Sequence, residues 1–398
     1  MIKEEKVNNA KLIDSITESI EKYSHEEALN NASYETGLMG YSLYYLYLSK
    51  YKNNSSYAEI AEKYFNKALA SFNPKTFHRV HGTDSLDCHL SHIGRYLIFC
   101  NNNNLLNVSS EDYLLKLDSI LFDLMKSKIS IKDFDSGTGA MSAGLYFLAR
   151  LKNGADVQEK ISLLIHSISD SAYEDEHGDY YWKCPSLYNR VYLGISHGSC
   201  LIISFLTSLY EIGLERHLCE RIIRKATSFL IRQYRKSPYK GLFPNQIGDK
   251  IEPMQFALCY GDIGIGYTLY RVSTALNDKS ISELSKIVLD DCLLRTKEDD
   301  LTLDAGIFYG ASGLAITFDK LAKLSGDERF AEKAMYWNKK ILEYAIHSNN
   351  YAGFKSRLTD ESIIWEISFG WGIIGVGVSL MYFSDKDLPS FADLTFIA

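Results

Sequence analysis

One pattern recurs along this chain: a glycine-centred turn runs directly into an apolar stretch. It appears seven times, 49 to 63 residues apart, with clear copies at Gly37 (GLMGYSLYYLYL) and Gly310 (GASGLAITF). The other copies begin at His89, Gly139, Gly198, Gly261 and Gly372. A unit that recurs at such intervals is typical of a repeat architecture. Repeat folds grow by adding units, so 398 residues do not require two or three separate cores here.

Each turn is preceded by a segment with helical periodicity that is charged on one face. A helix with a polar face lies at the surface, whereas a helix that is apolar all round is buried. Each unit is therefore predicted to be a hairpin of one outer and one inner helix. The predicted outer helices cover residues 11–23, 58–72, 113–127, 157–170, 218–234, 280–294 and 328–346.

The two ends of the repeat array indicate how the hairpins assemble. An open solenoid needs polar capping repeats at its ends. The last copy, FGWGIIGVGVSLMYF, is as apolar as the others. We therefore predict an all-α fold, an α/α toroid in which seven hairpins form a closed double ring, as a single domain over residues 1–398. Every inner helix then starts at the same end of the ring, so the turns bring their side chains together there.

Composition excludes several classes of protein. The net charge of −7 and the pI near 5.8 provide no basic surface for nucleic acid or an anionic membrane. The chain has no apolar run long enough to span a bilayer, and its polar N-terminus is unlike a signal peptide. Seven Cys without regular spacing do not indicate a disulfide framework. These features predict a cytoplasmic protein.

Residues beside the glycines provide the candidate chemistry. Asp135 lies four residues before Gly139, His197 directly precedes its glycine, and Cys259 and Tyr260 precede Gly261. An acid, an imidazole, a thiol and a phenol that converge are a plausible site for proton transfer and thiol chemistry. Four long connections, at residues 73–92, 171–194, 236–257 and 348–366, are rich in aromatic and polar residues. We expect them to pack over this end of the ring and shape a cleft.

These motifs resemble the lanthionine synthetase C-like (LanC) family of peptide thioether cyclases. His197-Gly198 and Cys259-Tyr260-Gly261 match the family's His-Gly and Cys-Tyr-Gly in identity, order and spacing. The resemblance implies that Cys thiols of a ribosomally made precursor peptide add to dehydroalanine or dehydrobutyrine, with a dehydratase or exporter as a further partner. It makes Cys259 a zinc ligand, His197 the acid/base group, Asp135 its carboxylate partner and Tyr260 a catalytic residue.

The sixth turn departs from the family pattern. The family has Cys-His-Gly there and uses both side chains as zinc ligands, whereas this chain reads Phe308-Tyr309-Gly310. Gln255 stands where the family often has Arg. Cys259 alone does not hold zinc at useful affinity. We therefore expect no cofactor, although the resemblance leaves zinc open. We expect Phe308, Tyr309 and Gln255 to contact the substrate.

Three functions fit these residues. In the first, a metal-free cyclase, His197 acts as the base on the substrate thiol. In the second, a scaffold without catalysis, the ring binds a precursor peptide or a partner enzyme. In the third, a glycoside hydrolase on a related ring, two carboxylates such as Asp135 and Asp262 would lie about 5–9.5 Å apart.

The second unit holds five potential metal ligands: His78, His81, Cys88, His89 and His92. Their spacing matches no established zinc motif. The simpler interpretation is that they lie on a partly exposed loop and helix start. The alternative, a metal site in this unit, stays open from the sequence.

Overall fold

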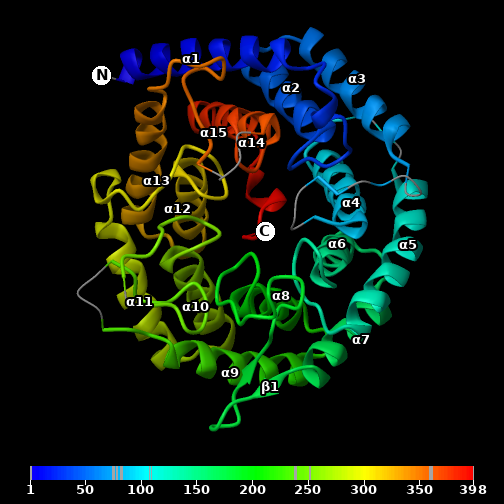
Figure 1. Cartoon of the computed structure of the whole chain (residues 1–398), viewed down its shortest axis with the longest axis vertical. Helices are drawn as coiled ribbons and strands as arrows, with labels where there is room; N and C mark the ends of the chain where they lie inside the picture. The colour runs from blue at the N-terminus through cyan, green and yellow to red at the C-terminus, as the bar shows by residue number, and fades with distance from the viewer. Residues whose placement is uncertain are drawn as a thin grey trace. The chain divides into compact units, whose positions relative to one another are not determined.

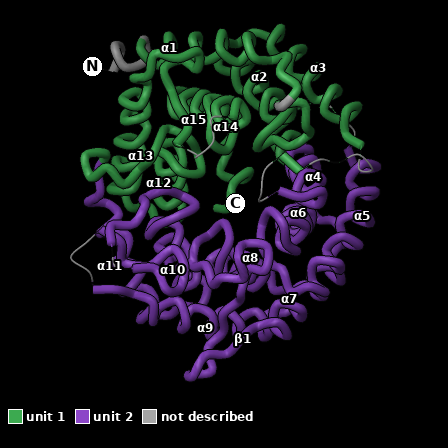
Figure 2. Tube along the Cα trace, in the orientation of Figure 1, with its two compact units in different colours: residues 1–80, 99–108, 297–398 green, residues 81–98, 109–296 purple. Residues whose placement is uncertain are grey.

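The computed structural model describes residues 2–73, 77, 79–80, 84–106, 108, 110–236, 240–250, 252–357 and 362–397. The chain forms two compact units (Figure 2). Unit 1 contains residues 1–80, 99–108 and 297–398, and unit 2 contains residues 81–98 and 109–296. Each unit is built from helical hairpins (Figure 1). No described helix is both long enough and apolar enough to cross a membrane. The single domain expected over the whole chain stays a prediction.

Seven helix pairs follow one another in the described part of the chain, as the repeat predicts. The outer members are α1 (Ile2–Lys22), α3 (Ser56–Ser71), α5 (Glu111–Ser130), α7 (Gln158–Asp170), α9 (Arg216–Arg232), α11 (Lys279–Leu294) and α13 (Glu328–Lys340). The inner members are α2 (Leu38–Lys52), α4 (Leu86–Asn102), α6 (Met141–Lys152), α8 (Ser199–Ile212), α10 (Asp262–Leu276), α12 (Ala311–Ser325) and α15 (Ile373–Ser384). Every predicted outer helix is present, and five of the seven lie within a few residues of their expected bounds. Helix α1 begins nine residues earlier than predicted, and α13 ends at Lys340, where the 3₁₀ helix η4 follows in place of the predicted α-helix.

Burial separates the two kinds of helix in the way that their sequences predict. Every residue from Ser199 to Tyr210 in α8 is buried, and so is every residue from Ile373 to Phe383 in α15. In α9 the buried positions instead follow a helical stripe, Ile222, Ile223, Ala226 and Leu230 among them. The inner helices therefore form the core of each unit, and each outer helix contributes one apolar face to it.

In six of the seven hairpins, the glycine before the inner helix is required by a close backbone contact. A Cβ atom on Gly198 would lie 2.3 Å from the carbonyl oxygen of Tyr192, six residues earlier. That oxygen accepts a hydrogen bond from the Ser199 amide at 3.0 Å, so it has a fixed place in the turn. The repeated glycines mark turns that fold back onto their own backbone. The same contact with the residue six positions earlier recurs at Gly37, Gly139, Gly261, Gly310 and Gly372.

The first and last hairpins pack against each other within unit 1. Helix α15 contacts both α1 and α2. The amides of Phe369 and Gly370 donate to the carbonyl of Glu35 at 3.0 and 3.2 Å, and the Tyr34 hydroxyl donates to the carbonyl of Leu394 at 2.7 Å. This contact between the ends of the repeat array is one that a closed ring requires.

The other elements are short. Strands β1 (Tyr173–Glu174) and β2 (Tyr180–Tyr181) pair antiparallel in the connection between α7 and α8, with Tyr173 opposite Tyr181. Helix α14 (Ile363–Ile367) precedes the last turn. Among the described residues, three short 3₁₀ helices occur in connections, η1 (Glu27–Leu29), η3 (Lys297–Asp299) and η4 (Ile341–Tyr344), and a fourth, η5 (Phe391–Leu394), follows α15.

Helix α4 differs from the expected second hairpin. It begins at Leu86, so His89 and His92 lie within the helix and are only 2% and 5% exposed. The partly exposed setting expected for them is therefore wrong. The Ser85 hydroxyl accepts a hydrogen bond from the Cys88 amide, which explains the early start because a serine oxygen there caps the first turn. His78 and His81 lie outside the described residues.

Candidate functional site

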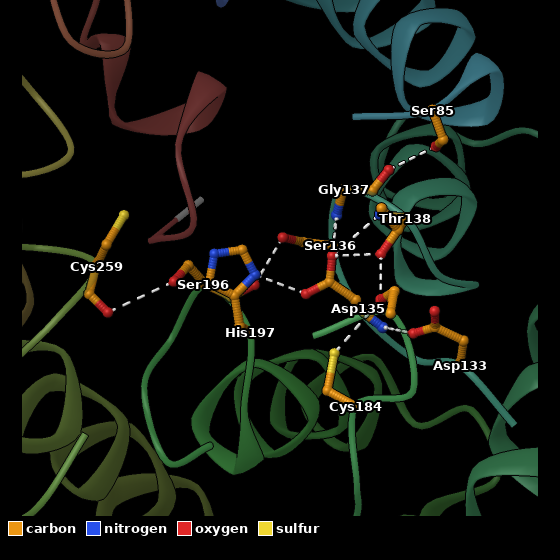
Figure 3. Close-up of polar contacts among 11 residues, drawn as sticks. Ser85, Asp133, Asp135, Ser136, Gly137, Thr138, Cys184, Ser196, His197 and Cys259 are labelled. Carbon is orange, nitrogen blue, oxygen red and sulfur yellow. Dashed lines mark hydrogen bonds and ion pairs between the residues drawn. The ribbon is translucent and has the colours of Figure 1, made fainter. Parts of the chain in front are cut away.

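Asp135 lies in the turn before α6 and is held as a buried carboxylate (Figure 3). Its Oδ1 atom accepts hydrogen bonds from the amides of Gly137 and Thr138 at 2.8 and 3.0 Å, and from the Thr138 hydroxyl at 3.1 Å. Burial alone would raise the pKa of Asp135. The charge and hydrogen bond of His197, together with the two amides, outweigh burial and lower the pKa below its usual value.

His197, in the turn before α8, completes a dyad with Asp135. Its Nδ1 atom lies 2.6 Å from Asp135 Oδ2, a distance typical of a charge-assisted hydrogen bond. An imidazole that donates from Nδ1 has its proton-transfer capacity on Nε2. The His197 side chain is 14% exposed, so the dyad is close to the surface of unit 2 but largely shielded from water.

Two tyrosines flank the imidazole. The Tyr260 ring lies 6.3 Å from the His197 ring between centroids, and the Tyr192 ring lies 6.4 Å away in an edge-on orientation. Burial raises the pKa of Tyr192, so its phenol stays protonated at neutral pH. Tyr260 was among the predicted site residues, whereas Tyr192 was not. Tyr192 lies six residues before its repeat glycine. At the same position the first, third and sixth turns have Asn31, Asp133 and Asp304, so the only signal in the sequence is a tyrosine where these turns have an amide or a carboxylate.

Cys259 is joined to the dyad's turns through its backbone. Its carbonyl accepts a hydrogen bond from the Ser196 hydroxyl at 3.5 Å, and the Ser196 carbonyl accepts one from the Ser136 hydroxyl at 2.6 Å. In Figure 3 the sulfur of Cys259 points away from the imidazole of His197. Cys259 is 4% exposed. The structure thus brings Asp135, His197 and Tyr260 together and places Cys259 on the adjoining turn.

A second layer of side chains supports the Asp135 turn. The Ser186 hydroxyl lies 2.5 Å from the Thr138 hydroxyl and can donate to it, because the Thr138 proton is directed to Asp135. The Cys184 thiol lies 3.6 Å from the same Ser186 oxygen. Burial raises the pKa of Cys184 to about 12, which makes this thiol unreactive at neutral pH. Ser186 and Cys184 belong to the connection between α7 and α8, one of the loops expected to shape the site. Serine and threonine are too common in loops for a sequence to single them out.

Gln255, in the turn before α10, has a buried amide nitrogen without a hydrogen-bond partner in the described part of the chain. Buried donors of this kind are rare in folded proteins and call for an explanation, such as an absent ligand or water. The substrate contact predicted for Gln255 stays a prediction.

Phe308 and Tyr309 lie in unit 1 and form part of an aromatic cluster. The Phe308 ring lies 4.9 Å from the Trp371 ring and 5.4 Å from the Phe396 ring, and it is 3% exposed. The Tyr309 ring lies 6.5 Å from Trp371 and is half-buried. At the position where the family has a cysteine ligand, this chain therefore has a packed core residue.

Asp262, one of the two carboxylates that a glycoside hydrolase would use here, is engaged in structural contacts. Asp262 is fully buried and forms an ion pair with Arg295. It also accepts hydrogen bonds from the amides of Leu242 and Phe243 at 2.8 and 3.0 Å. A carboxylate that anchors a loop and pairs with a buried arginine has a structural role.

Helix α4 holds two further imidazole pairs in unit 2. His89 Nε2 lies 3.0 Å from Asp84 Oδ2, and the Cys88 sulfur lies 3.5 Å from His92 Nε2. Among the described residues no group of three or more His, Cys, Asp or Glu side chains could hold a metal ion. His78 and His81 are outside that set, so the alternative metal site in this unit stays untested.

Two comparisons relate the chain to known proteins. A family model described as "Lanthionine synthetase C-like protein" matches residues 28–395. Among solved structures, a chain described as "Nisin cyclase" matches with a TM-score of 0.72 at 17% identity, over 97% of this chain and 96% of that one. None of the curated protein sequences matches the chain. The structural likeness confirms the all-α fold class predicted from the repeat, that of a helical toroid.

Proposed function

Because the chain belongs to the lanthionine synthetase C-like family, we propose that it acts as a lanthipeptide cyclase. Its reaction would be the addition of Cys thiols to dehydroalanine or dehydrobutyrine within a ribosomal precursor peptide. The observation that carries this proposal is the dyad, in which Asp135 accepts a hydrogen bond from Nδ1 of His197, so that proton transfer would use Nε2. A positioned imidazole of this kind typically contributes about 10²–10⁴-fold to a rate.

The residues at the family's zinc positions do not fit the metal. Phe308 offers no donor atom and packs against Trp371 and Phe396, and a tyrosine phenol is outside the usual N and S ligand set of zinc. Only Cys259 remains of the three ligands that the resemblance implies. We therefore propose a reaction that does not use zinc, and no step below depends on it.

The proposed reaction conserves its protons. His197 Nε2 takes the proton from the substrate thiol, and the carboxylate of Asp135 stabilises the imidazolium. The thiolate forms a C–S bond to the β-carbon of the dehydroamino acid while the C=C electron pair moves to the carbonyl oxygen as an enolate. The imidazolium then returns its proton to the α-carbon. Tyr260 and the Gln255 amide are the candidate donors to the enolate oxygen.

Incubation of the full chain with a dehydrated, Cys-containing peptide tests this proposal. Mass spectrometry after alkylation of free thiols counts the thioethers formed, because cyclised cysteines no longer react. We expect the wild type to exceed the buffer rate and His197→Ala to lose about 100-fold or more. His166→Ala is the matched control, since this exposed histidine lies on the outer helix α7 of the same unit. Equal rates for wild type and buffer would contradict the proposal.

A scaffold without catalysis is the second candidate. The loss of two zinc ligands at Phe308 and Tyr309 favours it. It predicts that the peptide binds with unchanged affinity to His197→Ala while no thioether forms with any variant. Calorimetric binding measured beside the cyclisation assay separates the two functions.

A further inference from the structure

The turns before the inner helices are linked to one another at a recurring position. Each link between two described turns is a hydrogen bond from one turn to the following turn. Its acceptor is the carbonyl of the residue that lies two positions before the repeat glycine of the following turn. In unit 1 this carbonyl belongs to Gly370 before Gly372, and to Glu35 before Gly37. In unit 2 it belongs to Gly137, Ser196 and Cys259, which precede Gly139, Gly198 and Gly261 (Figure 3).

The donors differ between the two units. In unit 1 they are backbone amides: Ile307 and Phe308 donate to Gly370 at 3.1 and 2.9 Å. These residues lie three and two positions before Gly310. In unit 2 the same two positions are Ser136 before Gly139 and Ser196 before Gly198, and their side-chain hydroxyls are the donors. A serine side chain therefore stands between the two backbones where unit 1 has a direct amide contact.

The Ser136 link acts directly on the dyad. Its hydroxyl donates to the carbonyl of Ser196 at 2.6 Å, and the next residue in the chain is His197. The residue before Ser136 is Asp135, the partner of that imidazole. Neighbouring residues of the same two turns thus carry both the side-chain dyad and the hydroxyl-to-carbonyl bond.

We propose that Ser136 is a positioning residue for His197. Its hydroxyl fixes the distance between the Asp135 turn and the His197 turn, so that the carboxylate meets Nδ1. Without the hydroxyl, the buried carbonyl of Ser196 would lack this partner, which favours a shift of the turn. A shift of even about 1 Å at a catalytic group is enough to cost a large part of its rate.

The test compares Ser136→Ala with a serine that makes no such link. Ser199 follows Gly198 in the turn of His197, and its hydroxyl is buried without a hydrogen-bond partner in the described part of the chain. Ser199→Ala therefore removes the same atom from the same region and leaves the link intact. Ser136→Thr retains the hydroxyl and serves as the rescue variant.

Two readouts are combined on the full-length protein. Histidine-labelled protein, with the His197 signal assigned by its absence in His197→Gln, yields the NMR titration of the imidazole. Ser136→Ala is expected to lower the titration midpoint by about half a pH unit, because a longer bond to Asp135 stabilises the imidazolium less. On the cyclisation assay it is expected to lower kcat about 10-fold with KM within twofold. Ser199→Ala should leave both unchanged, and Ser136→Thr should restore them.

An unchanged His197 titration in Ser136→Ala, with the fold retained by circular dichroism, would overturn the proposal. The rate readout rests on the proposed cyclase function, whereas the titration does not. If the wild type forms no thioether, the proposed function fails, and the titration midpoint alone still decides whether Ser136 positions His197.

Discussion

At the scale of single residues, the charge of Asp135 is the feature on which the dyad depends. Asp135→Asn keeps the shape of the side chain but removes the charge that stabilises the imidazolium. We expect this variant to lower the cyclisation rate by about 100-fold. Asp84→Asn is the matched control, because it changes the other buried Asp–His pair of unit 2. A rate close to wild type for Asp135→Asn would contradict the dyad mechanism.

The lowered pKa of Asp135 also predicts a pH dependence. The carboxylate remains ionised at and above its usual pKa of about 3.9, so its contribution to stability is complete there and is lost only as pH falls through the lowered value. Any acid limb of activity between about pH 5 and 7 is therefore not that of Asp135. A pH–rate profile of Asp84→Asn should retain that limb unchanged.

Asp304 predicts the opposite dependence in unit 1. Burial raises the pKa of Asp304 to about 6. The hydrogen bonds from the amides of Arg357 and Gly306 lower this pKa but do not offset the effect of burial. The folded state thus holds a proton that the unfolded state releases near pH 3.9, so stability falls as pH rises from about 4 to 6. Between pH 5 and 7 the loss is about 1 kcal/mol, and Asp304→Asn should abolish it. Urea unfolding at both pH values measures this difference.

At the scale of elements, an alanine substitution at a repeat glycine tests the contact that its Cβ atom would make with a backbone carbonyl. Gly198→Ala places a methyl group 2.3 Å from the Tyr192 carbonyl, which the Ser199 amide holds in place. Overpacking of this kind costs about 1–3 kcal/mol, and we expect the upper end because backbone has to move. Gly213→Ala is the control: this glycine ends α8 with φ of 90° and open space around it. Its cost should be about 1 kcal/mol. Equal losses for both variants in thermal or urea unfolding would contradict the steric explanation.

The hairpins could be predicted from the sequence because two independent periodicities agree: glycine turns at intervals and helical patterning between them. The start of α4 could not, since the cap at Ser85 carries no glycine and the histidines occupied the expected turn. Asp135, His197 and Tyr260 were predictable because their residue types carry chemistry. Ser136 and Ser196 were not, since their importance comes from contacts between turns about 60 residues apart. Tyr192 was not, because its position six residues before the repeat glycine holds a different residue type in the other turns.

At the scale of the whole molecule, the ends of the repeat array provide the link between sequence and assembly. The apolar last repeat predicted that it has a neighbour, and α15 does pack on α1 and α2. The backbone link from the seventh turn to the first uses the same acceptor position as the links between consecutive turns. The first hairpin thus continues the series after the seventh, which accounts for the absence of any polar capping sequence.

The metal content of the purified protein is the prediction that separates this chain from the zinc chemistry that the family resemblance implies. Phe308 packs among aromatic rings and Cys259 lies on a turn of unit 2, so the positions that the resemblance assigns to three zinc ligands retain one N or S donor. We expect well under one zinc per chain by mass spectrometry of the metal. A chelator should change neither the cyclisation rate nor the midpoint of thermal unfolding, because no folding free energy comes from metal binding. Stoichiometric zinc that is lost in Cys259→Ala would restore the family mechanism. Stoichiometric zinc that survives Cys259→Ala but is lost in Cys88→Ala with His92→Ala would instead place the metal on α4.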